Sequence, residues 1–272
     1  MKRRTMMSAL PVVLAAGVGT RTVSAAGTEG MRSKTPHTFV LVHGAWHGGW
    51  CWSGVADVLR AAGHRVYTPT QTGLADRSHL MSGNISINTF VDDIANLLIW
   101  EQLQDVVLVG HSFGGISVTG VADRMPERLR RLVYLDALLL QGGQTAFSQI
   151  PPDVVAARIK AANESSGGMS LPVPPASAFG LTREADQQQI AARLTPHPLS
   201  TYNTPLNLKN VLSNGVPTSY INCTAPIYSA LAKSRTLAKE QKGWTNIDLA
   251  TGHDAMVAAP VETAQLFMKI AG

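Results

Sequence analysis

The fold of this 272-residue chain is decided by one stretch, Val106-Val107-Leu108-Val109-Gly110-His111-Ser112-Phe113-Gly114-Gly115. Its first four residues are apolar and mostly β-branched, which is typical of a fully buried parallel strand. The glycines predict a sharp turn into a following helix. In a G-x-S-x-G turn between strand and helix, the serine backbone is strained and its hydroxyl is lifted above the sheet. We therefore predict that Ser112 is a nucleophile at the carboxyl end of a central strand.

Short apolar runs on both sides of this stretch alternate with segments of helical spacing. They predict strands at 38–42, 65–68, 132–135, 218–222 and 245–249, and helices at 50–62, 88–100 and 261–270. This alternation implies an α/β fold with a mostly parallel central sheet and helices on both faces. Asn88 is expected to cap its helix because its side chain can accept from the first free amides.

The alternation fails between about residues 138 and 215. This segment contains eight prolines and only two helical pieces, near 154–163 and 182–194. We predict a small cap inserted between strands of the sheet.

A serine nucleophile needs a base, and this kind of sheet places the histidine after the last strand. His253 lies there, just beyond the strand predicted at 245–249. Of the other histidines, His43 and His111 are expected to brace the turns around the nucleophile, His47 and His79 to line a substrate pocket, and His37, His64 and His197 to lie at the surface or in loops.

Two backbone amides are expected to hold the negative charge that develops on the substrate. The helix after Ser112 supplies the amide of Phe113, and the turn after the first strand supplies that of Ala45. Trp46 follows Ala45 and is expected, with His79, to contact the substrate.

The acid that orients His253 is harder to place, because no Asp or Glu occurs between residues 187 and 239. Asp136 ends the strand expected beside that of Ser112, at the sheet edge where such sites assemble. We predict that its carboxylate holds the distal nitrogen of His253. A structural role for Asp136 remains open, as does a water-assisted dyad, and Asp254 and Asp248 are weaker candidates.

These motifs resemble the plant methylesterase and hydroxynitrile lyase family and its bacterial esterase relatives, within the α/β-hydrolase superfamily. The resemblance covers nearly the whole mature chain, most clearly residues 38–137, and predicts one α/β-hydrolase domain over residues 36–272. It is carried by four segments, 43–52, 72–80, 110–115 and 252–254. It implies an α/β-hydrolase fold without a cofactor, with a small helical cap over an apolar pocket. The family's nucleophile, base and oxyanion positions fall on Ser112, His253, Ala45 and Phe113.

Three positions depart from the family pattern. Lyases of the family have a threonine where this chain has Gly44 and a lysine where it has Asp254, so cyanide elimination is not expected. Pro226 occupies the usual position of the acid, which therefore cannot be carried over from the family.

The resemblance and these departures favour a serine carboxylesterase that hydrolyses a small, largely apolar ester through an acyl-enzyme on Ser112. A lyase or a hydrolase of carbon–carbon bonds on the same fold remains an alternative. A non-catalytic ligand-binding protein is a third possibility, because the acid is displaced.

The N-terminus predicts export. Residues 1–25 combine basic residues, an apolar run and a small-residue cleavage pattern, and Arg3-Arg4 resembles a twin-arginine signal. We expect a periplasmic or secreted protein. Removing this leader removes four basic residues and no acidic one, which lowers the formal net charge from +5 to +1. Charge therefore gives no indication of a nucleic-acid partner.

The remaining composition indicates neither a membrane span in the mature chain nor a metal site. No other apolar run reaches the roughly 20 residues that a span requires. Cys51 and Cys223 are the only cysteines, and both are expected to be buried free thiols. The histidines show no metal-binding spacing. The sequence indicates no oligomeric state.

Overall fold

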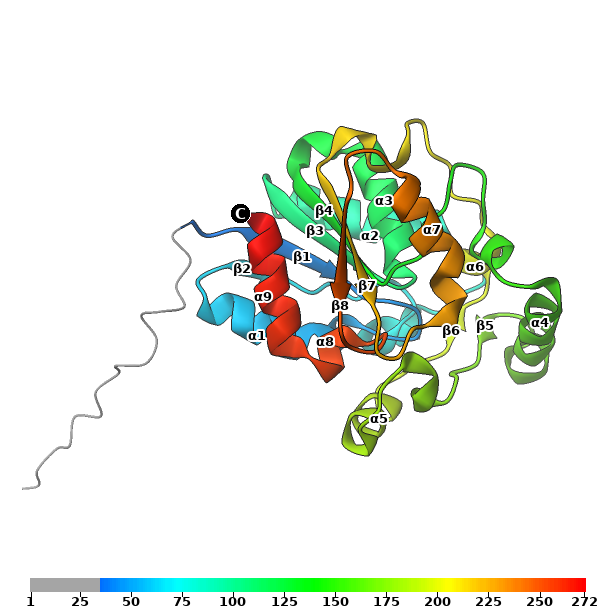
Figure 1. Ribbon diagram of the computed structural model, residues 1–272. Coiled ribbons are helices and arrows are strands. Elements are labelled where there is room, and N and C mark those ends of the chain that lie inside the picture. Colours follow the sequence, from blue (N-terminus) through cyan, green and yellow to red (C-terminus); the bar gives the residue numbers. More distant parts are fainter. Residues whose placement is uncertain (1–34) are drawn as a thin grey trace, which may run out of the picture. The chain divides into compact units, whose positions relative to one another are not determined.

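The computed structural model describes residues 35–272, so the export signal predicted at 1–25 lies outside the described residues (Figure 1). Its centre is a six-stranded sheet in the order β2-β1-β3-β4-β7-β8, with every neighbouring pair parallel. The strands are β1 (Thr38–Val42), β2 (Arg65–Tyr67), β3 (Val106–His111), β4 (Leu129–Leu135), β7 (Thr218–Cys223) and β8 (Thr245–Leu249). The strand that carries the serine motif therefore lies in the interior of the sheet.

Helices cover both faces of this sheet (Figure 1). One face carries α1 (Ser53–Ala61) and α9 (Pro260–Ala271), and the other carries α2 (Ile87–Trp100), α3 (Gly114–Arg124) and α7 (Ala232–Glu240). Short helices join them: η2 (Gly49–Trp52), η3 (Ala75–Leu80), η4 (Pro126–Arg128), η7 (Leu212–Gly215), η8 (Ser229–Leu231) and α8 (Ala255–Ala258). No helix in the described part of the chain is both long and apolar enough to cross a membrane.

The alternation of side chains along β3 explains the two layers. Val106 and Leu108 pack into the core under α2 and α3, whereas Val107 and Val109 pack into the core under α1 and α9. Because successive strand residues point to opposite faces, a strand buried on both faces must be apolar throughout.

The segment predicted as a cap lies between β4 and β7, outside the six-stranded sheet, and is called the cap below (Figure 1). Its elements are η5 (Ala146–Gln149), α4 (Pro152–Ser166), β5 (Ser170–Leu171), η6 (Ala176–Phe179), α5 (Glu184–Ala191), β6 (His197–Pro198) and α6 (Ser200–Asn203). β5 and β6 pair as a small antiparallel sheet that the sequence did not predict.

Most predicted elements occur where the sequence placed them, and the differences have local causes. Ser86, not Asn88, caps α2, because Ser86 and Thr89 each accept a hydrogen bond from the other's amide in a capping box. Helix α7 was not predicted, since Ala232–Glu240 has a polar face and follows no clear start signal. Cys51 and Cys223 are buried free thiols, as expected.

The turn around Ser112 depends on close backbone contacts. A Cβ atom on Gly114 would lie 2.5 Å from the carbonyl oxygen of His43 and 2.8 Å from that of Val42. A Cβ atom on Gly115 would lie 2.5 Å from the carbonyl oxygen of Leu138. The start of α3 is thus packed directly against the backbone of the neighbouring loops, which only glycine permits.

We predict that Gly114→Ala destabilises the protein by about 1–3 kcal/mol, because the added methyl group meets backbone atoms that cannot rotate away. Urea unfolding measures the change. Gly83→Ala is the matched control, since a Cβ atom there has nothing within 4 Å. Equal stability of the two variants would contradict the packing argument.

Candidate active site

Ser112 lies in the turn between β3 and α3 and has a φ of +51°. This left-handed conformation is strained for a residue other than glycine. The amide of Ser112 donates to the carbonyl of Leu135 over 3.3 Å. This hydrogen bond to the end of β4 stabilises the strained backbone conformation of Ser112. The serine remains partly exposed.

His253 lies in the loop between β8 and α8, and both of its ring nitrogens are engaged. Its Nε2 is 2.9 Å from Ser112 Oγ, and its Nδ1 is 2.7 Å from Asp136 Oδ2. The ring stacks on Tyr228, with a centroid separation of 4.2 Å and an interplanar angle of 23°. Ser112, His253 and Asp136 therefore form one hydrogen-bonded line.

Asp136 directly follows β4 and is completely buried. Its Oδ1 accepts from Arg235 of α7 over 2.8 Å and from the amide of Cys223 over 3.4 Å. Burial by itself would raise the pKa of Asp136, but the hydrogen bond and charge of His253 and the charge of Arg235 outweigh it and lower the pKa. The carboxylate is therefore held ionised although it is buried.

The other candidate acids do not contact His253. Asp248 lies on β8, where its carboxylate accepts from Asn222 over 3.0 Å. Asp254 points away from the imidazole of His253, toward His47. Pro226, at the family's usual acid position, is exposed.

The two expected oxyanion donors are free within the described part of the chain. The amides of Ala45 and Phe113 donate to no protein acceptor there. The amide of Ala45 shares its peptide group with the carbonyl of Gly44, which accepts from His43 Nδ1 over 2.8 Å. His43 Nε2 in turn accepts from the amide of Gln71, so the ring is the Nδ1–H tautomer. As predicted, His43 braces this turn.

The next peptide group is fixed at both of its ends. The carbonyl of Ala45 accepts from His47 Nδ1 over 2.8 Å, and the amide of Trp46 donates to His197 Nδ1 over 3.3 Å. Trp46 has a φ of +64°. Three histidines thus hold the oxyanion turn, and one of them, His197, comes from the cap.

A buried ion pair lies behind the turn. His47 Nε2 is 3.0 Å from Asp254 Oδ2, and both side chains are at most 1% exposed. Burial by itself would lower the pKa of His47, but the Asp254 carboxylate outweighs it and raises the pKa. Burial would raise the pKa of Asp254, but the charge and hydrogen bond of His47 lower it.

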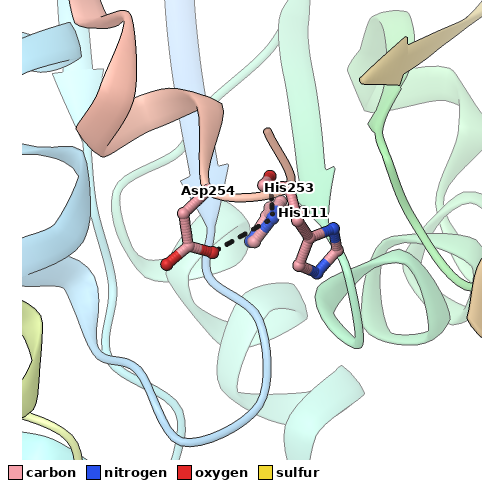
Figure 2. A group of neighbouring side chains, drawn as sticks. All are labelled: His111, His253 and Asp254. Atoms are coloured by element: carbon pink, nitrogen blue, oxygen red, sulfur yellow. Dashed lines mark hydrogen bonds and ion pairs between the residues drawn. The ribbon is translucent and has the colours of Figure 1, made fainter. Parts of the chain in front are cut away.

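Figure 2 shows His111 between Asp254 and His253. His111 Nε2 donates to the backbone carbonyl of His253 over 3.0 Å and lies 3.8 Å from Asp254 Oδ1. Potential metal-binding atoms of these three residues lie within 4.8 Å of one another. A metal bound through His253 would have to displace its hydrogen bond to either Ser112 or Asp136, so the cluster is better suited to supporting the histidine loop.

The two predicted substrate-contacting residues differ in position. Trp46 is 8% exposed and lines a cavity of ≈ 220 Å³ beside Tyr228, which stacks on His253. His79 is exposed in η3 and does not line that cavity, so its contact with the substrate stays a prediction.

His37 and His64 lie in loops, as predicted, although both are buried at 5% exposure, whereas His197 was wrongly predicted, since it lies in β6 and is 0% exposed. His37 and His64 stack on each other near the C-terminus, and His197 is enclosed by aromatic rings. Isolated histidines carry no periodic signal that could have indicated burial.

Sequence reasoning also missed Arg235 and Tyr228, which support Asp136 and His253. Both follow β7, in the segment that lacks any acidic residue. The only available signal was that a buried Asp136 would need a positive partner in addition to His253.

The sequence matches the Alpha/beta hydrolase family over residues 39–266. The chain belongs to this family. It is 40% identical over 236 residues to the carbendazim hydrolyzing esterase of Nocardioides sp. (strain SG-4G), a match that covers 84% of this chain and 96% of the relative. The protein is accordingly a hydrolase that acts on small-molecule esters.

Other matches cover a shorter segment or have a lower sequence identity. The chain is 40% identical to an alpha-hydroxynitrile lyase of Arabidopsis thaliana over 108 residues, which span 38% of this chain and 40% of the lyase. An extracellular alpha/beta-hydrolase from a Paenibacillus species superposes with a TM-score of 0.75 at 24% identity, covering 86% of this chain and 99% of the other. That structural likeness shows the common fold.

The buried histidines predict that the folded protein loses stability at acidic pH. Burial lowers the pKa of His43 to about 4 and that of His111 to about 3, and it lowers the pKa of His197 well below the ordinary value of 6.5. Below pH 6.5 the unfolded chain therefore binds protons that the folded chain does not. Each such histidine should cost roughly 1.4 kcal/mol of stability per pH unit.

Urea unfolding between pH 8 and pH 4 measures this slope, and His197→Asn should reduce it, whereas His79→Asn at an exposed position should not. His47 acts in the opposite direction, because its pKa is raised. Its contribution to the stability of the folded protein is present below pH 6.5 and is lost as the pH rises above that value. An acid slope unchanged in His197→Asn would contradict the assignment.

Proposed function

We propose that this protein is a serine carboxylesterase in which Ser112 is the nucleophile, His253 the base and Asp136 the acid. The observation that carries the proposal is the continuous line from Ser112 Oγ to His253 Nε2, at 2.9 Å, and from His253 Nδ1 to Asp136 Oδ2, at 2.7 Å. Both distances are within hydrogen-bond reach for proton transfer and for orientation of the imidazole.

In the first half of the reaction, Ser112 Oγ attacks the ester carbonyl carbon and its proton passes to His253 Nε2. The amides of Ala45 and Phe113 stabilise the oxyanion that forms. The carbon–oxygen bond to the alcohol then breaks, and His253 gives its proton to the departing alkoxide. The acyl group remains on Ser112.

In the second half, His253 takes a proton from water, and the resulting hydroxide attacks the acyl carbon. The bond to Ser112 Oγ breaks as His253 returns the proton to that oxygen, which releases the acid. Asp136 stays ionised throughout and stabilises the imidazolium. Arg235 supports this role because it balances the buried charge of Asp136 when His253 is neutral.

The proposed substrate is a small, largely apolar ester. In support, the cavity beside Tyr228 measures ≈ 220 Å³ and is lined mostly by apolar side chains, among them Trp46, Leu171 and Phe179. Carbendazim, for which the bacterial relative is named, belongs in the panel of test substrates.

Two observations favour ester hydrolysis over cyanide elimination. A Cβ atom on Gly44 would lie 2.8 Å from the Cβ of Ser112, so the site has no room for the threonine of the related lyases. Asp254, in place of their lysine, is neutralised by His47. Measuring the rate of hydrolysis of p-nitrophenyl esters and the rate of cyanide release from a cyanohydrin separates the two activities.

We predict that Ser112→Ala abolishes turnover of p-nitrophenyl esters and labelling by a fluorophosphonate. Asp136→Asn should lower kcat by on the order of 10⁴-fold, because an amide stabilises the wrong tautomer of His253. Asp248→Asn is the control and should stay near wild type, since Asp248 lies exposed on β8. Undiminished turnover in Ser112→Ala, or failure of wild type to react with the probe, would contradict the proposal and favour a binding protein.

We further propose that the chain is exported with removal of residues 1–25, on the sequence pattern described above. N-terminal sequencing of the protein recovered from the periplasm or medium of a bacterial host should give Ala26 as the first residue. Replacing Arg3 and Arg4 by lysine should retain the precursor inside the cell if the twin-arginine route is used. An uncleaved chain in the cytoplasm of the wild-type strain would contradict export.

A further inference from the structure

Arg158 lies on cap helix α4 and borders two cavities. The first, called here the Trp46 cavity, measures ≈ 220 Å³ and is lined by Arg158 together with Trp46, Leu171, Phe179 and Tyr228. The second, called here the Phe147 cavity, measures ≈ 820 Å³ and is lined by Arg158 together with Phe147, Ile150, Val155 and Lys233. Arg158 is therefore a cation shared by two otherwise mainly apolar spaces.

No carboxylate neutralises this cation within the described part of the chain. Arg158 takes part in none of the ion pairs there, although it is only partly exposed. No acidic residue lines either cavity. Charged side chains that are partly removed from water are usually paired, because an isolated charge there is costly.

The protein contacts of Arg158 are with two tyrosines, and they include a hydrogen bond from its guanidinium to the phenol oxygen of Tyr202. Its guanidinium carbon lies 5.9 Å from the ring centroid of Tyr202, which is a weak cation–π contact. Arg158 is also close enough to oppose the rise that burial causes in the pKa of Tyr202 and of Tyr228. The guanidinium therefore lies near two phenol groups, which leave its charge uncompensated.

This position is close to the proposed catalytic residues. Tyr228 lines the Trp46 cavity and stacks on His253, and Trp46 directly follows the oxyanion residue Ala45. The Trp46 cavity, with Arg158 in its lining, therefore borders one residue that contacts the proposed base and one that adjoins the proposed oxyanion donor.

Other cations near the cap are satisfied differently. Arg193 packs on the ring of Trp50 at 4.5 Å, in a cleft that also contains Asp76. Lys233 donates to the carbonyl of Ser148 over 3.3 Å. Of these three, Arg158 alone borders the Trp46 cavity.

We propose that Arg158 determines specificity by binding a free carboxylate at the far end of the substrate, so that among esters with an apolar chain the enzyme prefers half-esters of dicarboxylic acids. The inference rests on the proposed esterase function of Ser112. A guanidinium fork matches a carboxylate with two parallel hydrogen bonds, and the apolar walls strengthen that pairing. The aliphatic chain between the two acid groups packs against Leu171 and Phe179.

The test compares monomethyl esters of dicarboxylic acids, from succinate to suberate, with the corresponding methyl esters in which a neutral amide replaces the free acid. The two members of each pair have nearly the same size and differ in charge. For the best chain length, kcat/KM of wild type should be about tenfold to hundredfold higher for the acid, as expected for a charged hydrogen bond. Added salt should reduce this ratio.

Arg158→Met should bring the ratio close to one, and Arg158→Lys should retain part of it, because lysine keeps the charge without the fork. Lys160→Met is the matched control, since Lys160 lies on the same helix with a side chain 76% exposed. It removes the same charge and should keep the wild-type ratio. Turnover of the neutral ester in each variant shows that it has folded.

A wild-type ratio near one at every chain length, or a ratio that survives in Arg158→Met, would overturn the role of Arg158 and leave the esterase proposal standing. An equal fall of the acid-to-amide ratio in Lys160→Met would also overturn the role of Arg158, because the preference for the acid would then come from the general charge of the cap. If wild type hydrolyses no ester of either series or of the p-nitrophenyl panel, the proposed function itself fails.

Discussion

The carboxylate of Asp136 is the interaction on which the rest of the site depends. One oxygen holds the imidazole of His253, and the other accepts from Arg235 of α7 and from the amide at the end of β7. These three partners lie 87, 99 and 117 positions from Asp136 in the sequence and meet at this one buried group. A buried anion is stable only when its partners are in place, so the fold and the orientation of His253 are coupled.

The cap takes part in this arrangement. The amide of Asp254 donates to the carbonyl of Phe179, and a Cβ atom on Gly252 would lie 1.9 Å from the carbonyl oxygen of Gly180. The cap therefore touches the backbone of the histidine loop. It also holds the oxyanion turn, through His197 and through the amide of Thr195, which donates to the carbonyl of Trp46. A substitution in the cap can thus affect catalysis by moving either loop, as well as by changing contacts with the substrate.

Two separate buried carboxylates, each with its own cationic or hydrogen-bonding partners, lie near His253. Asp136 is balanced by Arg235 and His253 on one side, and Asp254 is balanced by His47 on the other. His111 lies between the two carboxylate groups. Burial together with the charge of His253 lowers the pKa of His111 to about 3, so it remains a neutral donor to the His253 backbone. This separation keeps Asp254 from competing with Asp136 for the imidazole, although Asp254 is the sequence neighbour of His253.

The sequence by itself determined the parallel sheet, the turn at Ser112 and the position of His253, because apolar strands, flanking glycines and chain order are local signals. It also indicated Asp136, since a strand beside β3 ends at the same edge. It could not determine that Arg235 would reach Asp136, that His47 would pair with Asp254, or that His197 would be buried. In these contacts the two partners are separated by 99, 207 and 151 positions in the sequence, and only tertiary packing brings such residues together. Packing likewise decided that Arg158 would lie beside a cavity with no acidic residue in its lining, which no local pattern around α4 indicates.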